Sequence, residues 1–444
     1  MISKKQLLIS VFMVVFIFFI QCSKILEKPQ TDDLSDHNKK NPFNEHKKSL
    51  VSDGKEIFRF DTFGDEDFWS GLLHIDKAIA GANHGGFGPG VSPKTALAVG
   101  LKVDTDALPP EVIAGIQSGA INLDDPATTI ALLKLNAVLG IKGNFSSEGN
   151  LQSIGITCAS CHSTVDNSFA PGIGKRLDGW PNRDLNVGTI ISLTDNAQPI
   201  ANLLHVDEPT LRNVLSLWGP GKFAAVLFMD GKAFRPDNKI AANLIPAAFG
   251  LRGIDLATYT GWGSIKYWNS FVGNLEMHGK GNFFDPRLND PAKYPITVEN
   301  QFYNVMNTPD LITPKLDALR AYQHSIDAPK PPAGSFDRFA ALRGRRVFFT
   351  KAKCDNCHKS PLYADNVLHT GAELGIDNFE AMRSPTGKYR TTPLGGLFAR
   401  EKGGFYHDGR FATLLDVVNH YDRHNRLNLS RKEKADLVEY LKSL

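Results

Sequence analysis

This sequence lacks a large excess of charge of either sign. Its 50 Lys and Arg residues are nearly balanced by 47 Asp and Glu residues, which leaves a formal net charge of +3. This balance argues against nucleic acid as a partner, and no polybasic patch is present that would bind an acidic membrane surface. The hydrophobic content of 42% over 444 residues excludes a disordered protein, because such a chain can bury two or three cores.

Long apolar runs are also missing, apart from one near the N-terminus. Residues 7–20 form a run of 14 apolar residues after a short basic segment, which is too short for a comfortable membrane span and typical of a secretory signal peptide. The run stops just before Cys22, so we expect residues 1–21 to be removed and Cys22 to carry a lipid anchor. A plain signal peptide and an uncleaved anchor are the alternatives. The expected location is therefore periplasmic, with the exported protein tethered to the membrane by lipid.

Segments that alternate between apolar and polar residues are scarce, so few strands are expected. The fold class is predicted to be mainly α with long loops. Helical spacing of apolar residues occurs over 126–139, 208–218 and 336–348. Ser430 and Glu433 match the capping box, in which the two side chains bond the exposed amides at a helix start, and they predict the beginning of a last helix.

Composition along the chain predicts the domain organisation. Residues 22–56 are polar and predict a tether that cannot form a core of its own. An N-terminal domain is expected over residues 57–330 and a C-terminal domain over residues 331–444. The segment 328–334 is rich in proline and predicts a stiff connector between them.

Five cysteines are few for this length, and four of them form two copies of one motif. Both copies have the pattern Cys-x-x-Cys-His, which attaches c-type haem. The first consists of Cys158, Cys161 and His162, and the second of Cys354, Cys357 and His358. Two thiols at this spacing can bond two vinyl groups of one haem, and the adjacent histidine then becomes the proximal iron ligand. A four-cysteine zinc site would explain neither histidine, and a thioredoxin-like dithiol would need a strand–turn–helix context, so two covalently bound c-type haems are expected.

The C-terminal part carries a more specific pattern. Arg390–Leu394, followed by the segment Gly404–Tyr421, resembles the second haem domain of the bacterial di-haem peroxidase superfamily. This superfamily includes periplasmic cytochrome c peroxidases, the enzyme that matures the quinone cofactor of methylamine dehydrogenase, and haem-dependent rubber oxygenases. The resemblance covers roughly residues 336–444 and implies two cytochrome c-like haem domains, the N-terminal one enlarged by insertions. In such domains the first and last helices pack together, and Gly344 and Tyr440 stand at the matching positions.

The resemblance also implies how each iron is ligated. Family members place the sixth ligand of the second haem on the helix after the His-Asp-Gly segment, and Tyr421 stands there with His420 beside it. A protein ligand at that position closes the iron to other molecules. For the first haem, no histidine occurs between His162 and His205. The first iron is therefore expected to be open.

Further candidate residues follow from the resemblance or from their chemistry. Family members often place a tryptophan between the haems. Trp262 and Trp268 are the candidates for inter-haem electron transfer, and Trp268 is preferred because its position after the first haem resembles that of the rubber oxygenases. Glu276 and Asp166 are candidates for acid–base catalysis at the open haem. His205 and the pair Met277–His278 are distant candidates for a ligand of the first haem, and His369, His407 and His424 are further candidates for the second.

The expected function is peroxidase-like redox chemistry. Peroxide or dioxygen would bind at the N-terminal haem, while the C-terminal haem would transfer electrons. One alternative is a haem-dependent oxygenase of an organic substrate, which the separation of 196 positions between His162 and His358 favours. Another is a non-catalytic electron-transfer cytochrome. The expected cofactors are two c-type haems, with calcium as a further candidate, and the expected partner is a small redox protein or a quinol-linked electron donor or acceptor.

Overall fold

The computed structural model describes residues 42–444. The predicted signal peptide, Cys22 and the first part of the predicted tether lie outside the described residues. Residues Ser49–Leu444 form one compact unit, so the proposed division into 57–330 and 331–444 stays a prediction. No helix within 42–444 is both long and apolar enough to cross a membrane.

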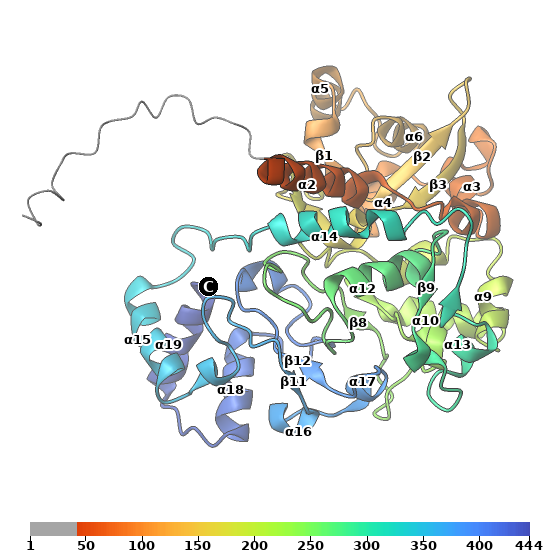
Figure 1. The fold of residues 1–444 in the computed structure, drawn as a ribbon. Coiled ribbons are helices and arrows are strands. Elements are labelled where there is room, and N and C mark those ends of the chain that lie inside the picture. The colour runs from red at the N-terminus through yellow and green to blue at the C-terminus, as the bar shows by residue number, and fades with distance from the viewer. Residues whose placement is uncertain (1–41) are drawn as a thin grey trace, which may run out of the picture. The chain divides into compact units, whose positions relative to one another are not determined.

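Helices dominate the structure, as expected (Figure 1). The α-helices of the first part of the chain are α2 (Pro42–Phe60), α3 (Ile75–Ala80), α4 (Pro93–Ala98), α5 (Pro110–Ser118), α6 (Pro126–Lys134), α7 (Ala159–His162), α8 (Val187–Ile191), α9 (Gln198–Leu203) and α10 (Glu208–Trp218). Those of the second part are α11 (Leu227–Asp230), α12 (Ile265–Phe271), α13 (Pro295–Glu299), α14 (Leu316–Ser325), α15 (Arg338–Phe349), α16 (Gly371–Leu374), α17 (Phe379–Met382), α18 (Leu414–His424) and α19 (Arg431–Lys442). Most are short, and long loops connect them.

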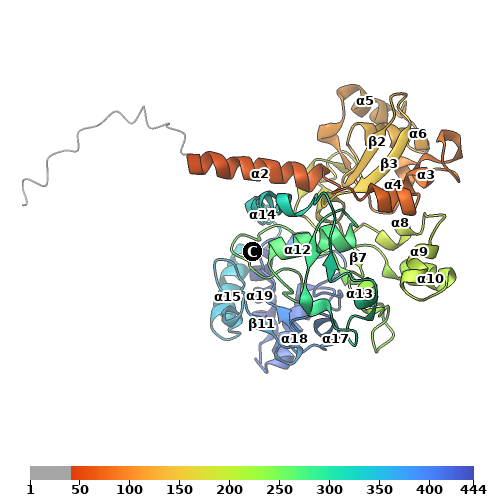
Figure 2. The same ribbon diagram turned by 45° about the vertical axis from the view of Figure 1, so that its right-hand side comes forward.

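The strands are short and pair only two at a time within the described residues. The parallel pair is β1 (Val103–Asp104) with β5 (Ile173–Gly174). The antiparallel pairs are β2 (Ile141–Phe145) with β3 (Leu151–Ile156), β4 (Ser163–Val165) with β6 (Arg176–Asp178), β7 (Lys222–Phe223) with β8 (Asn243–Leu244), β9 (Phe283–Phe284) with β10 (Asn304–Val305), and β11 (Leu368–His369) with β12 (Tyr389–Arg390). The hairpin of β2 and β3 lies beside α3 and α6 in both ribbon views (Figures 1 and 2).

The end of the predicted tether is helical, which corrects the expectation that residues 22–56 stay without structure. Residues Ser49–Glu56 belong to α2, which packs on α14. A Cβ atom at Gly54 would lie 1.9 Å from the Ala318 carbonyl oxygen, so only glycine lets the two backbones approach this closely. Phe58, which follows the predicted tether on the same helix, is fully buried, and its ring centroid lies 5.4 Å from that of Tyr322. The polar composition of residues 22–56 gives no sign of this packing.

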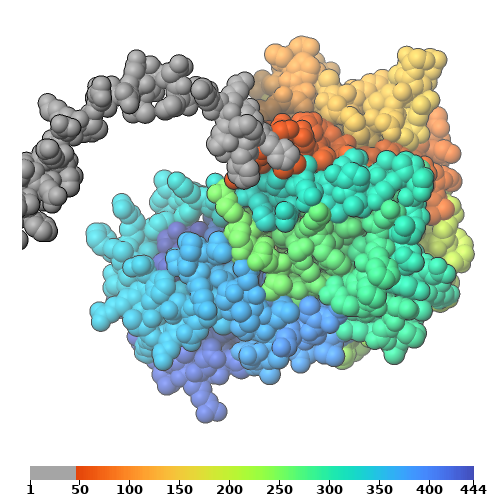
Figure 3. Space-filling view, viewed as in Figure 1, coloured from red at the N-terminus to blue at the C-terminus, as the bar shows by residue number. Residues whose placement is uncertain are grey.

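The apolar core consists of several clusters. The largest lies within residues 69–242 and is built from the N-terminal helices and the β2–β3 hairpin. A second lies within residues 347–441 and joins α15, α18 and α19. On the face shown in Figure 3, the green and teal segments that include α12 and α14 lie between the N-terminal and the C-terminal surfaces.

The packing of α15 on α19 confirms the predicted contact of the first and last helices of the C-terminal part. A Cβ atom at Gly344 would lie 1.9 Å from the carbonyl oxygen of Asp436. The rings of Phe348 and Tyr440 meet edge to face at 5.2 Å. The capping box of Ser430 and Glu433 at the start of α19 is also confirmed.

Candidate functional site

Two cavities contain the two Cys-x-x-Cys-His motifs. Cavity 1 has a volume of about 500 Å³ and is lined by Cys158, Cys161 and His162. Cavity 2 has a volume of about 630 Å³ and is lined by Cys354, Cys357 and His358. Both volumes fall within the range of small-molecule and cofactor sites. Each motif therefore has its own cavity, and in residues 42–444 all four thiols are free of disulfides.

The first motif is held by its backbone. The Gly179 amide donates to the His162 carbonyl at 2.7 Å, and the Asn182 amide donates to the Cys161 carbonyl at 2.8 Å. The Ser160 hydroxyl donates to the Gly140 carbonyl at 2.6 Å. A side chain at Gly140 would collide with the Ser160 backbone, which explains the glycine. These contacts fix the short helix α7 at the edge of cavity 1.

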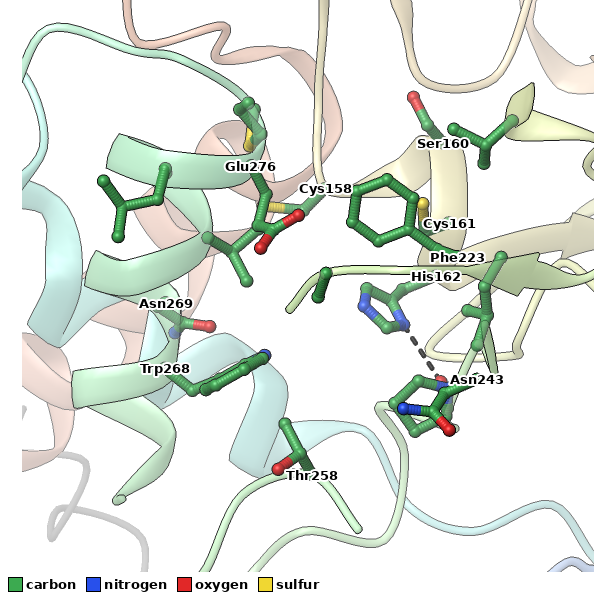
Figure 4. Close-up of a pocket in the computed structure, with 18 of the residues that line it drawn as sticks. Cys158, Ser160, Cys161, His162, Phe223, Asn243, Thr258, Trp268, Asn269 and Glu276 are labelled. Carbon is green, nitrogen blue, oxygen red and sulfur yellow. Dashed lines mark hydrogen bonds between the residues drawn. The ribbon is translucent and has the colours of Figure 1, made fainter. Parts of the chain in front are cut away.

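Each motif histidine bonds a backbone carbonyl through Nδ1. The distance is 3.1 Å from His162 to the Pro246 oxygen (dashed in Figure 4) and 2.8 Å from His358 to the Tyr363 oxygen. A metal-ligating histidine usually donates its other ring nitrogen in this way, which leaves Nε2 for the metal. Burial lowers the pKa of His162 to about 4 and also lowers that of His358, so both rings are neutral at pH 7. Neutral imidazole is the form that binds metal, so both sites fit a haem iron.

The cysteines do not meet in a single metal site. They line different cavities, so the structure does not support the four-cysteine zinc alternative. Burial raises the pKa of Cys158 and Cys161 to about 12, which disfavours the thiolates that zinc and redox dithiols require.

One other group of donors comes together within residues 42–444. It consists of Cys357, Asp365 and His369. His369 and Asp365 already bond each other at 3.0 Å. Calcium prefers a shell of oxygen ligands, which this group does not offer, and the calcium expectation stays a prediction.

Of the two acid–base candidates, Glu276 and Asp166, the structure places only one in cavity 1. Glu276 ends a short π-helical segment that follows α12, and its side chain points into cavity 1 across from Cys158 and His162 (Figure 4). Its Oε2 atom is buried and has no hydrogen-bond partner, and burial raises its pKa well above the usual carboxyl range. Asp166 instead lies in an exposed loop and accepts from the amides of Ser168 and Lys175, both at 2.9 Å. Of these two candidates, Glu276 is therefore the one that lines the cavity of the first motif.

The distant ligand candidates for the first haem also lie in different places. His205 is exposed and bonds Glu299 at 2.8 Å, and it does not line cavity 1. Met277 and His278 both line cavity 1. The His278 ring stacks on Phe68 with centroids 3.7 Å apart, and burial lowers the pKa of His278 to about 4.

Tyr421 and His420 point to different places. Tyr421, on α18, lines cavity 2, and desolvation of its hydroxyl group raises its pKa. His420 does not line the cavity, because its Nε2 lies 2.7 Å from the Leu374 carbonyl and its ring stacks on His424. The structure therefore does not support His420 as a ligand of the second haem, whereas Tyr421 is placed where one could act.

Cavity 2 also contains Tyr406, which sequence reasoning did not assign, and His407, one of the further ligand candidates. The buried hydroxyl of Tyr406 lies near that of Tyr421 but completes no hydrogen bond, and the Tyr406 backbone has φ of 70°. A left-handed φ is strained for a tyrosine and often marks a functional position. His407 is 2% exposed, and its Nε2 has no hydrogen-bond partner. The only sequence signal for Tyr406 is its place just before the His-Asp-Gly segment.

The wall between the two cavities does not contain Trp268. The residues that line both cavities are Pro246, Ala247, Leu251, Tyr259 and Arg390. Trp268, from α12, lines cavity 1 alone and stacks on Phe271 with centroids 4.6 Å apart. Inter-haem electron transfer through Trp268 stays a prediction, and Tyr259 is the aromatic residue of the shared wall.

Comparison with known proteins finds distant relatives. No family model matches the chain. The methylamine utilization protein MauG of Methylorubrum extorquens is 28% identical over 155 residues, which cover 29% of this chain and 42% of that protein. The cytochrome-c peroxidase IdrP1 of a Pseudomonas species is 26% identical over 189 residues, which cover 29% of this chain and 48% of that protein. The chain is a distant homologue of the di-haem cytochrome c peroxidase superfamily.

The homology to the di-haem superfamily is partial in extent. The chain spans less than half the length of either curated relative that it matches. A solved MauG-like protein associated with microbial copper homeostasis is 18% identical, with 50% of this chain and 80% of that chain covered and a TM-score of 0.31. Hydrazine synthase of Kuenenia stuttgartiensis is 26% identical, with 33% of this chain and 59% of that chain covered and a TM-score of 0.24.

Proposed function

We propose that this protein is a di-haem c-type cytochrome that reduces peroxide at cavity 1 and passes electrons through cavity 2. The observation that carries the proposal is the pair of separate cavities, each with one Cys-x-x-Cys-His motif and an anchored, neutral histidine. His162 and His358 would be the proximal ligands, and the four thiols would form the covalent links. Bound haem supplies the iron at which peroxide is reduced.

Glu276 would perform the proton chemistry at cavity 1. Reduction of hydrogen peroxide to two water molecules consumes two electrons and two protons, and one proton must reach the departing oxygen. The Oε2 atom of Glu276 is buried and unpartnered, and burial raises the pKa of the carboxyl group well above its usual range, which favours the protonated form. A protonated carboxyl group that faces the reacting site is suited to act as general acid.

Tyr421 would make the second site different from the first. Its side chain approaches cavity 2 together with Tyr406 and His407, so several oxygen or nitrogen donors are available for a sixth ligand. A closed iron exchanges electrons without binding peroxide. The C-terminal haem would therefore receive electrons and pass them across the shared wall to cavity 1.

The wider setting is also a proposal. The two motifs would belong to two cytochrome c-like domains, and the protein would be exported to the periplasm and tethered by lipid on Cys22. Its electron partner would be a small redox protein or a quinol-linked donor or acceptor.

An oxygenase of an organic substrate is the second candidate. Cavity 1 extends beyond the motif along a mainly apolar lining that includes Leu72, Ile200, Leu203, Phe228 and Phe302. Several of these side chains are partly exposed, so an apolar molecule could approach the cavity through them. Dioxygen consumption with an added apolar alkene, and without peroxide, would favour this candidate.

The mass of the protein tests the proposal most directly. The intact mass should exceed that of the processed polypeptide by two haems, and acidified organic solvent should leave the colour on the protein. Replacement of Cys354 and Cys357 by serine should reduce the excess to one haem. Release of all haem into the solvent would overturn the proposal.

A further inference from the structure

Three arginines near the wall between the cavities are buried without an acidic partner. Arg183, Arg390 and Arg400 are 7%, 8% and 9% exposed. All three line cavity 2, and Arg390 lines cavity 1 as well. None of them forms an ion pair with any carboxylate of residues 42–444.

Backbone carbonyls hold these side chains and leave some N–H groups unused. Arg400 donates to the carbonyls of Pro393 at 2.8 Å and Gly395 at 2.9 Å. Arg390 donates through Nε to the Thr258 carbonyl. The buried atoms without a partner are Arg390 Nη1, Arg183 Nε and Arg400 Nε. The guanidinium groups are therefore oriented by the fold but not neutralised by it.

This arrangement is unusual for buried arginine. A buried charge without a counter-ion carries a large desolvation cost, so buried charges are normally paired. Arg383, which is equally buried, follows that rule and bonds Asp230 through two nitrogens at 2.8 and 3.0 Å. Burial lowers the pKa of Arg390 and Arg400 only to about 10, so both remain cationic at neutral pH. The cluster lacks the anions that would balance it.

We propose that Arg183, Arg390 and Arg400 bind the propionate carboxylates of the two haems, and that Arg390 serves both haems. This inference rests on the proposed function, because it requires a haem in each cavity. The planar guanidinium group matches a carboxylate with two parallel N–H donors, and such pairs are among the strongest hydrogen bonds in proteins. The position of Arg390 at both cavities makes it a shared contact.

The cluster would also set the redox potentials. Ferric haem carries one more positive charge than ferrous haem, so a nearby buried cation destabilises the ferric form and raises the potential. Loss of Arg390 should lower the midpoint potentials of both haems. Loss of Arg400, which lines cavity 2 alone, should lower chiefly the potential of the haem at His358.

A spectroelectrochemical titration of the holoprotein tests this pattern. Arg390→Gln should shift both midpoint potentials downward, Arg400→Gln should shift only that of the second haem, and Arg390→Lys should shift each potential less than Arg390→Gln does. Arg346→Gln, an exposed position on α15, is the matched control and should shift neither. If Arg390→Gln does not accumulate, Arg183→Gln should lower only the potential of the second haem.

The outcomes separate the inference from the proposed function. Covalent haem is counted on the same samples, and a wild-type count below two would defeat the proposed function itself. Two haems with potentials unchanged in Arg390→Gln, or changed in one haem only, would overturn the inference. The wild-type titration is repeated with increasing phosphate at constant ionic strength. A saturable shift would show that the cluster binds an exchangeable anion instead of propionate, which would also overturn it.

Discussion

At the scale of single residues, the surroundings of the Glu276 carboxyl group determine whether it can hold a proton in cavity 1. Its neighbours in cavity 1 include Trp268 and the thiol of Cys161, and desolvation is what raises its pKa. A carboxyl group in water loses its proton near pH 4, whereas a buried one without a charged partner keeps it. The residue can therefore hold a proton where peroxide would bind.

Glu276→Gln should lower the turnover of hydrogen peroxide by roughly 10²–10⁴-fold, the usual contribution of a general acid, while two haems remain bound. The wild-type rate should fall as the pH rises through the raised pKa of Glu276, because the acid form is lost. The variant should lack that decline, since an amide has no proton to lose. Asp166→Asn, in its exposed loop, is the control and should behave as wild type in steady-state assays. An equal loss in both variants would contradict the role of Glu276.

Sequence reasoning could predict only part of the site at this scale. The two motifs were recognisable because their chemistry depends on five consecutive residues. Tyr259 and Arg390 were not assigned to the wall, because they approach it from segments far apart in the sequence. The choice of Tyr421 over His420 required the direction of each side chain on α18, and adjacent residues of a helix point about 100° apart. Position in the sequence does not give that direction by itself.

At the scale of elements, the contact between α15 and α19 depends on one glycine. Gly344 has an ordinary helical backbone, so glycine is not needed there for its conformation. It is needed because the absence of a side chain leaves space for the Asp436 carbonyl. The same contact brings Phe348 against Tyr440 and closes the core behind cavity 2, which Phe348 and Leu437 line.

Gly344→Ala should therefore destabilise the protein even though alanine favours helices. The added methyl group must push the two backbones apart, and overpacking of this kind costs about 1–3 kcal/mol. Gly71→Ala is a suitable control, because the nearest atom to its new methyl group would be 3.9 Å away. Denaturant titration of the holoprotein should show a lower free energy of unfolding for Gly344→Ala alone. Equal stability of the two variants would contradict the close packing.

The three predicted helices all exist and begin within two residues of the predicted start, but one of them ends early. The predicted helix 208–218 is confirmed as α10, where Asp207 caps the first turn and Pro209 lies within it. The predicted helix 126–139 starts correctly at Pro126, but α6 ends at Lys134. Asn136 adopts a left-handed φ of 53°, and the apolar residues beyond it are buried in a loop. Apolar spacing alone does not distinguish a helix from such a buried loop.

At the scale of the whole molecule, each cavity takes residues from both parts of the chain. Glu380 and Arg390 reach cavity 1 from the C-terminal part, while Arg183 and Tyr259 reach cavity 2 from the N-terminal part. Composition suggested a boundary near residue 330, but contacts across that boundary complete both cavities. The division at that boundary stays a prediction, and sequence reasoning did not predict that both parts line each cavity.

The two cavities should make the two haems chemically unequal. Cavity 1 contains the acid Glu276 with a buried, partner-free oxygen, whereas cavity 2 places Tyr421 beside Tyr406 and His407. The haem at His162 should be open, high-spin or water-bound in the ferric state, and should bind one equivalent of cyanide. The haem at His358 should be low-spin and resist cyanide.

Electron paramagnetic resonance of the ferric protein measures this difference. Tyr421→Phe should change the low-spin signal and raise cyanide binding towards two equivalents, because it removes the phenol oxygen from the cavity. His420→Ala should leave the signal unchanged, since its Nε2 is occupied by the Leu374 carbonyl. If Tyr421→Phe has no effect, the ligand is one of the other two donors, which Tyr406→Phe and His407→Ala distinguish. Two low-spin, cyanide-resistant haems in the wild type would instead identify a non-catalytic electron-transfer cytochrome, because neither iron could then bind peroxide.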